Sequence, residues 1–463
     1  MAPLPSSSPA SAWQRDTQFR GLLALLLTYL LLLAVIPPNF EFGRYAAAED
    51  LTAMAEGSFW GKVQFLPVLM IGAAIVLWRY QLAVFMVPSL NLPLVALLLW
   101  CLTSMLWSVD PAATLRRSVK IIGFFALFWA LCLAAWHPRR FENLVRGAAS
   151  LLLLASLGLV LVKPAWGVTD YVEHAGLWRG IMQNKNTLGN VSALTLIVWV
   201  QAWAARRLPL RWTLPGIGLC LLCLLGARST TAILCGGLGS LIVIALLRAP
   251  LDLRGRWLGV WMIAVIGVVL PIWFVAVFLG TPSVTGVIGP IAGLFGKDAT
   301  LTGRSDIWVL VLDYWRDHAL LGSGYGSFWL GLKGPSGVIA EELGWIPFQA
   351  HNGYIDILNE LGLVGLILLA AWFLVHLQGL REVHRFDPPV AALHLALFVY
   401  ALIYNISESV WLRPLNFLDV LVMYSTVEIS RQRLRPRLAQ ISRPAPRQAA
   451  GTPYGAAGQR AAS

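Results

Sequence analysis

The sequence predicts an all-α integral membrane protein of about twelve transmembrane helices, with a long polar insert between the ninth helix and the tenth. Hydrophobic residues make up 58% of the chain and charged residues only 13%, against about 25% charged in a typical soluble domain. Apolar runs near the length of about 20 residues that a helix needs to cross a bilayer recur along almost the whole chain. Lipid leaves backbone groups no partner outside their own helix, so each run is predicted to be helical.

The predicted spans begin near the start of the chain. The first apolar run lacks the small-residue cleavage site of a signal peptide and ends in Pro37-Pro38, so it is predicted to be a membrane span. The predicted spans cover residues 20–37, 62–78, 89–107, 119–136, 148–162, 187–204, 212–227, 231–247, 257–280, 361–378, 390–406 and 414–430. The predicted organisation is a disordered segment at 1–18, helices one to nine within 19–280, an outward-facing insert at 281–355, the last three helices within 356–430, and a basic disordered tail at 431–463.

Charge along the chain predicts the orientation of these helices. An even number of spans places both termini on one side of the membrane, and the arginine-rich tail predicts that this side is the cytoplasm. The loops predicted to lie inside also carry arginine, at Arg139, Arg140, Arg146, Arg206, Arg207, Arg211, Arg248, Arg254, Arg256, Arg381 and Arg385. The net charge of +12 is therefore assigned to topology and to anionic lipid, not to nucleic acid, and the insert faces outward.

Several cations lie outside or at outer helix ends, against this rule. They are Arg116, Arg117, Arg179, Lys185, Arg228, Arg304 and Arg413. Most of them fall where an outward-facing span begins or ends, so they are predicted to converge on one outer cavity that binds an anion. The alternative is that each side chain only extends to the phosphates of the surrounding lipids.

Two polar clusters lie at the outer mouths of predicted spans. Residues 176–189 combine two cations with three amides and three glycines. They adjoin a helix start, whose N–H groups also point at anions, and this composition suits a phosphate group. Residues 228–231 offer an arginine with three hydroxyl groups, although a capped turn alone explains the same residues.

The insert contains a predicted amphipathic helix at residues 304–320. Its apolar residues recur with helical spacing at Ile307, Leu310, Val311, Tyr314 and Trp315. This helix is predicted to lie on the outer membrane surface. The glycines at 322, 324 and 326 that follow are predicted to form a flexible turn.

His351 stands immediately before Asn352, which is predicted to start a helix that also carries Glu360. A histidine titrates near neutral pH and can act as a general base on a hydroxyl group. A lone histidine at a helix start is more often structural, but the outer cations favour a catalytic role. No Asp-rich metal motif accompanies it, and the five cysteines all lie in apolar runs, so neither a metal site nor a disulfide framework is predicted.

Several short motifs, in order along the chain, resemble the O-antigen ligase and polymerase superfamily. They are Arg179-Gly180 with Asn184-Lys185-Asn186-Thr187-Leu188-Gly189, then Arg228-Ser229, Gly303-Arg304-Ser305 with Trp308, Gly322-Ser323-Gly324-Tyr325-Gly326, and His351-Asn352 with Glu360-Leu361-Gly362. The resemblance runs from about Trp107 to Glu408, and it rests on the combined order because each motif alone is weak. The first motif is most similar to exopolysaccharide polymerases of the succinoglycan type.

The resemblance implies a metal-independent, inverting glycosyltransferase with no cofactor, located in the bacterial inner membrane with its active site facing the periplasm. Its donor would be a polyprenyl-diphosphate-linked glycan and its acceptor another saccharide. A flippase and a chain-length regulator are implied as further partners. Arginines gathered outside would then bind the diphosphate leaving group and stabilise its charge.

The resemblance also implies roles for single residues. His351 would deprotonate the acceptor hydroxyl, and Arg179, Arg228 and Arg304 would hold the diphosphate. Topology adds weaker candidates for the same role, and four further residues are predicted to support the site. The weaker candidates are Lys185, Arg116 and Arg413, and the supporting residues are Asn184, Asn186, Asn352 and Glu360.

Two alternatives stay open. A ligase would transfer the glycan to lipid A-core, whereas a polymerase would add another lipid-linked repeat unit; the form of residues 179–189 favours the polymerase. A transporter or flippase for an anionic glycolipid would also need many spans and a basic cavity. It should carry ionisable residues near mid-membrane, yet the spans 148–162 and 231–247 hold none, which favours an enzyme at the membrane surface.

Overall fold

The computed structural model describes residues 20–36, 59–134, 138–169, 175–250, 259–261 and 304–434. Within these ranges the regular secondary structure is helical, apart from two isolated bridges at Val168–Trp178 and Leu330–Lys333. The predicted all-α class is thus confirmed for this part of the chain. The disordered segment predicted at 1–18, nearly all of the ninth span and the insert up to residue 303 lie outside the described residues.

The helices start where the sequence supplies caps. At the start of six of the helices, the side-chain oxygen of the N-cap residue accepts a hydrogen bond from a backbone N–H of the first turn. These N-cap residues are Asn91, Asp110, Asn184, Asn352, Asp387 and Asn416. The elements are α2 (Arg20–Leu33), α4 (Phe59–Trp78), α5 (Tyr80–Met86), α6 (Leu92–Thr103), α7 (Pro111–Leu133), α8 (Pro138–Val162), α9 (Pro164–Gly167), α10 (Lys185–Ala204), α11 (Leu210–Ala227), α12 (Thr230–Arg248), α16 (Arg304–Arg316), α17 (Pro335–Leu343), α18 (Gly353–His384), α19 (Pro388–Tyr404) and α20 (Phe417–Gln432).

Within the described residues, fewer helices than predicted are long enough to cross a membrane. By length and composition, five of the described helices can cross a membrane: α8, α10, α11, α12 and α18. A sixth candidate is the pair α4 and α5, which is bent by 86°. The predicted spans near α2, α6 and α19 form apolar helices that are shorter than a bilayer crossing needs. The chain is therefore a multi-pass membrane protein, and the count of twelve is not confirmed.

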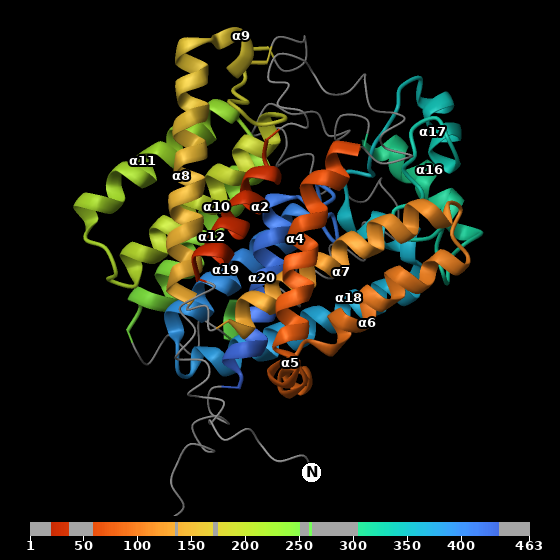
Figure 1. Ribbon diagram of the computed structural model, residues 1–463. Helices are drawn as coiled ribbons and strands as arrows, with labels where there is room; N and C mark the ends of the chain where they lie inside the picture. The colour runs from red at the N-terminus through yellow and green to blue at the C-terminus, as the bar shows by residue number, and fades with distance from the viewer. Residues whose placement is uncertain are drawn as a thin grey trace, which may run out of the picture.

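Buried and exposed helices are arranged as expected for a bundle in lipid (Figure 1). α10 and α19 are buried along most of their lengths and pack against α12. α8 and α11 lie further out, and they expose leucines such as Leu151, Leu161 and Leu225. Their outward faces are apolar because lipid, unlike water, can cover them.

α18 is broken at Gly362, which has φ 66° and ψ −168°. A Cβ at this position would lie 2.2 Å from the carbonyl oxygen of Leu320, so only glycine allows the chain after α16 to pass this closely. The predicted start of the tenth span, at residue 361, coincides with this break. The first turns of α18 are therefore a separate arm that belongs to the polar end of the bundle.

The apolar face of α16 is buried against protein, where the sequence predicted contact with the membrane surface. Ile307, Trp308 and Val311 form a satellite cluster with Phe328 and Ile355, from the loop before α17 and from the arm of α18. Figure 1 shows α16 and α17 side by side at this end of the molecule. The helical periodicity was interpreted correctly, but the surface that it faces is a protein core.

The opposite end of the bundle collects the loops that are predicted to lie inside. Arg207 pairs there with Glu142, and Arg433 pairs with Glu382 at 2.7 Å. Arg431, predicted to begin the disordered tail, belongs instead to α20. It is buried and pairs with Glu428 at 2.7 Å, because a buried carboxylate requires a cationic partner.

Candidate active site

The carboxylate of Glu408 joins four segments that are far apart in the sequence. Its Oε1 atom accepts hydrogen bonds from Asn186 Nδ2 at 3.0 Å and from Arg304 Nη2 at 3.2 Å. Its Oε2 atom lies 3.3 Å from His351 Nδ1 and 3.4 Å from Gln349 Nε2. Three residues singled out from sequence, Asn186, Arg304 and His351, thus meet at one carboxylate. We call Glu408 and its four partners, Asn186, Arg304, Gln349 and His351, the Glu408 cluster.

Glu408 lies in the loop between α19 and α20 and was missed by the sequence analysis. Burial alone would raise the pKa of its carboxyl group. The hydrogen bond with His351 and the charge of Arg304 outweigh burial, so the pKa lies below the ordinary value of 4.5. The group is therefore ionised at neutral pH. One signal could have identified it: a lone acid in a polar stretch between two apolar runs, in a loop predicted to lie outside.

His351 is held in an uncommon backbone conformation. Its φ is +51°, in the left-handed region that few non-glycine residues occupy, and such strain is often found at functional sites. The following Asn352 caps α18 through bonds from Tyr354 N and Ile355 N, and its own N–H donates to Ser409 Oγ. The backbone on both sides of the imidazole is thus tied to the start of α18 and to the Glu408 loop.

Gly353 allows this close approach. A Cβ at this position would lie 2.1 Å from Asn405 Oδ1. The Gly353 N–H instead donates to the carbonyl oxygens of Asn405 and Glu408, at 2.8 Å and 3.1 Å. A side chain here would separate the start of α18 from the loop and would move His351 away from Glu408.

The contact with Glu408 sets the protonation of the His351 ring. An ionised carboxylate only accepts hydrogen bonds, so the contact with Glu408 favours the tautomer with the proton on Nδ1. Gln349 Nε2, which lies 3.2 Å from the same nitrogen, then donates to Glu408 instead. In the neutral imidazole the Nε2 atom is then an acceptor. The side chain is 30% exposed, against 14% for Glu408, so the ring is partly open to solvent while its partner is enclosed. This is the arrangement of an oriented general base.

The start of α10 contributes the other contact at this end. Asn184 caps the helix by accepting from Thr187 N at 2.9 Å and from Thr187 Oγ1 at 3.1 Å, which is a structural role. Asn186 points to Glu408, and Lys185 lies between them on the first turn. The predicted phosphate motif is therefore built into the same region as His351.

Arg179 and Arg228 lie at this end of the bundle, but neither is one of the five residues of the Glu408 cluster. Arg179 is buried, and its Nε atom donates to the carbonyl oxygen of Trp166 at 3.0 Å. Arg228 is exposed and ends α11 in a left-handed conformation. Three residues later, Thr231 Oγ1 accepts from Ser407 Oγ at 3.1 Å, which places the Arg228 turn next to the Glu408 loop.

Arg413 belongs to a second polar network. Its Nη2 atom lies 3.0 Å from Asp356 Oδ2 and 3.2 Å from Glu360 Oε1, both on the arm of α18. Burial alone would lower the pKa of Arg413, but the two carboxylates raise it above its ordinary value. Asp356 Oδ1 also accepts from Ala350 N at 3.2 Å, so this network holds the residue before His351.

Glu360 extends this second network to the glycine-rich loop and α7. Its Oε2 atom accepts from Gly326 N at 2.8 Å, and Arg117 donates to the Gly326 carbonyl oxygen. Residues 322–331 are buried throughout, so the turn predicted to be flexible is a packed part of the fold. Arg116 is partly buried beside Arg117 on α7, at this side of the polar end.

Most of the aromatic residues of the insert are part of the packing. Trp308, Tyr325, Phe328 and Trp329 are buried and are unable to present a face to a sugar. Trp345 and Phe348 are 47% and 37% exposed, only a few residues before His351, and they remain candidates for stacking on a sugar ring.

No group of three His, Cys, Asp or Glu side chains within the described ranges is arranged to hold a metal ion. The five cysteines, which lie in apolar runs, are buried. Cys220 and Cys223 fill space inside the bundle. The polar chemistry of the described part is carried by histidine, carboxylates, amides and arginines.

Comparisons with known proteins show what the chain is similar to. A family model described as O-Antigen ligase matches residues 215–370, which run from α11 into α18 and include Arg228, Arg304 and His351. The chain is also similar to the "Exopolysaccharide production protein ExoQ" of Rhizobium meliloti (strain 1021), with 27% identity over 347 residues that cover 72% of this chain and 74% of that relative. These two similarities support the resemblance to the O-antigen ligase and polymerase superfamily that the motifs indicated.

Proposed function

We propose that this protein is a polysaccharide polymerase: an inverting, metal-independent glycosyltransferase at the periplasmic face of the bacterial inner membrane. Its donor would be a polyprenyl-diphosphate-linked oligosaccharide, and its product an exopolysaccharide or O-antigen of repeated units. The observation that carries the proposal is the contact of His351 with Glu408, beside Arg304. An oriented base and a cation are the groups that sugar transfer from a diphosphate to a hydroxyl requires.

In the proposed reaction, His351 Nε2 removes the proton from a hydroxyl group of the acceptor sugar. The acceptor oxygen forms a bond to the anomeric carbon of the donor, on the side opposite the diphosphate. The bond from that carbon to the diphosphate oxygen breaks, polyprenyl diphosphate leaves with the electron pair, and the configuration inverts. Glu408 orients the imidazole and stabilises the imidazolium that forms, as the carboxylate of a hydrolase triad does.

Arg304 is the arginine best placed to stabilise the leaving diphosphate. Its Nη1 atom donates to the carbonyl oxygen of Ser407 at 2.6 Å, and its Nη2 atom donates to Glu408. A guanidinium group carries five N–H donors. Two are used to fix the group, and the others can bind phosphate oxygens. We assign the same role to Arg228 and Arg179, with Lys185 and Arg116 as weaker candidates.

We assign Arg413 a positioning role. The carboxylates of Asp356 and Glu360 neutralise the positive charge of Arg413. Arg413 would therefore bind a diphosphate less strongly than an arginine that pairs with no carboxylate. Through Asp356 it supports the backbone of Ala350 and thereby the orientation of His351. Asn352 acts in the same way by capping α18.

The proposal is tested with the purified protein, a polyprenyl-diphosphate oligosaccharide and EDTA, with and without a lipid A-core acceptor. A ladder of repeat units without lipid A-core supports the polymerase and metal independence. Product only when lipid A-core is present would instead show a ligase, the second candidate, which the description of the matched family favours. The similarity to ExoQ is why we place the polymerase first.

Glu408→Gln is expected to lower the turnover number by about 10–100-fold, because a hydrogen bond to a charged group contributes about 1.5–3 kcal/mol. The amide keeps the size of the side chain but neither orients the Nδ1 proton as strongly nor stabilises the imidazolium. Single-turnover rates at saturating donor measure this loss apart from binding. A raised KM with an unchanged turnover number would contradict the positioning role.

The lowered pKa of Glu408 also predicts how the stability of the fold depends on pH, and the same variant tests it. Because the pKa of Glu408 in the folded protein lies below 4.5, its carboxylate stabilises the fold above about pH 4.5. That stabilisation is lost as the pH falls through the lowered pKa. The difference in melting temperature between the wild type and Glu408→Gln should therefore be largest near neutral pH and shrink on acidification. A difference that stays constant down to pH 3 would show that Glu408 is not stabilised as an anion.

A further inference from the structure

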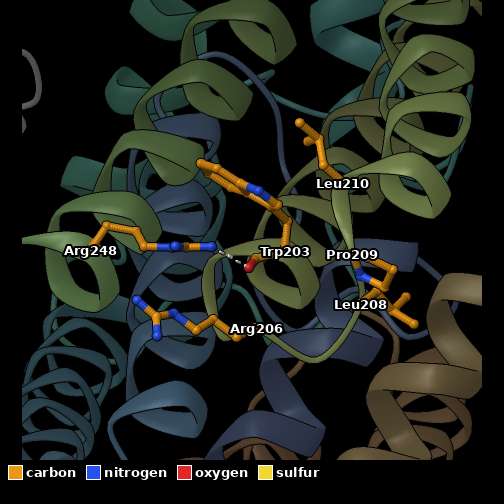
Figure 2. A pocket seen from close by; sticks show the side chains of 6 residues that line it. All are labelled: Trp203, Arg206, Leu208, Pro209, Leu210 and Arg248. Atoms are coloured by element: carbon orange, nitrogen blue, oxygen red, sulfur yellow. Dashed lines mark hydrogen bonds between the residues drawn. The ribbon is translucent and has the colours of Figure 1, made fainter.

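A cavity of about 320 Å³ lies at the end of the bundle opposite His351, where α10 ends, α11 begins and α12 ends. It is lined by Trp203, Arg206, Leu208, Pro209, Leu210 and Arg248 (Figure 2). In the proposed orientation this is the cytoplasmic end, so the cavity takes no part in the reaction at the Glu408 cluster.

Local structure fixes the two arginines in this pocket. Arg248 Nη2 donates to the Trp203 carbonyl oxygen at 2.8 Å, and the Arg248 guanidinium lies 4.6 Å from the centre of the Trp203 ring. Arg206 has φ +56°, a left-handed conformation that ends α10, and its N–H also donates to the Trp203 carbonyl oxygen. Trp203 therefore organises both cations.

The six residues that line the described pocket carry positive charge. None of the six lining residues is acidic, and Figure 2 shows the guanidinium groups of Arg206 and Arg248 on the same side of the pocket. Like charges in one pocket repel each other, and a bound anion would relieve this repulsion. Planar guanidinium groups match the oxygens of a phosphate group.

The other wall of the pocket is apolar and leads to the outside of the bundle. Leu208, Pro209 and Leu210 form this wall. Leu210 is 48% exposed, and further along α11 Trp212 and Leu214 are 64% and 53% exposed. A ligand whose phosphate meets the arginines could therefore place hydrocarbon chains along α11. A free phosphate ion would use only half of this surface.

We propose that this pocket binds an anionic phospholipid, with the headgroup phosphate held by Arg206 and Arg248 and the acyl chains lying along α11. The lipid fastens the α10–α11 and α12 ends to the membrane surface. Each arginine near the membrane surface adds to the affinity of the protein for an anionic lipid. The site is independent of the proposed glycosyltransferase activity, so each proposal can be tested without the other.

The test is native mass spectrometry of the full chain in detergent, titrated with phosphatidylglycerol, with phosphatidylcholine and with inorganic phosphate. The pocket variant is Arg206→Gln with Arg248→Gln. The matched control is Arg381→Gln with Arg385→Gln, which removes two exposed arginines at the same end but outside the pocket. We expect the pocket variant to bind phosphatidylglycerol roughly tenfold or more weakly, while the control binds like the wild type.

Three outcomes would overturn the proposal. They are equal weakening in the pocket variant and its control, equal binding of phosphatidylcholine, and inorganic phosphate that binds as tightly as the lipid. Arg206→Gly guards against misfolding as the cause, because glycine accepts the left-handed conformation at this position without strain. This variant should be as stable as the wild type and should still lose affinity for phosphatidylglycerol.

Discussion

His351→Ala is expected to lower the rate of sugar transfer by about 10²–10⁴-fold, the contribution of a general base to catalysis. The imidazole is partly exposed and belongs to neither hydrophobic core cluster, so the variant protein should still insert into the membrane in normal amounts. The measurement is polymer yield and single-turnover rate in proteoliposomes, normalised to the amount of folded protein. Affinity for the donor should change little, because the base acts on the acceptor.

His318→Ala is the matched control for this prediction. His318 is an exposed histidine of the same insert, and its ring stacks on Tyr314 with 4.6 Å between centroids. It lies outside the Glu408 cluster, so its loss should leave the rate within about twofold of the wild type. Unchanged polymer yield in His351→Ala would refute the catalytic assignment.

Arg304→Lys is expected to lower the rate by about 10²-fold or more, in the range measured when one donor to a developing charge is removed. The guanidinium reaches the Ser407 carbonyl oxygen and Glu408 with two different nitrogens. An ammonium group is a single point of charge and lacks this forked geometry. The loss should appear mainly in the turnover number with the natural donor, where charge develops on the diphosphate.

Arg316→Lys provides the comparison within the same helix. Arg316 ends α16 and pairs with Asp313 at 2.9 Å, and both side chains are 72% exposed. Exposed pairs of this kind contribute little to stability, so the substitution should have almost no effect. Equal activities of Arg304→Lys and Arg316→Lys would indicate that Arg304 only extends to lipid phosphates.

Much of the fold was predictable from the sequence because the environment acts on local patterns. Apolar runs form helices in lipid wherever they occur, so a helix stands at each predicted span that the structure describes. Periodicity identified the buried face of α16, with Ile307 and Val311 among its residues. What covers that face was not predictable, since membrane and protein bury the same apolar side chains.

Boundaries were less predictable for a similar reason. The span predicted at 361–378 begins at a break in α18, and the residues before Gly362 fold as an arm of the polar end. Hydropathy reports where a segment can enter lipid, but it does not report a change in helix direction. The positive φ of Gly362 depends on the approach of Leu320, which is a tertiary contact.

By itself, the sequence determined the helical class, the apolar bundle and the residue types at the polar end, including His351, Arg304 and Asn186. Only the tertiary structure decided which positive and negative side chains pair with each other. Glu408 is 57 residues from His351 and 222 from Asn186 along the chain, and Arg413 proved to be paired with Asp356 and Glu360. Electrostatic partners are chosen by distance in space and by burial, and a linear chain specifies neither until its helices pack.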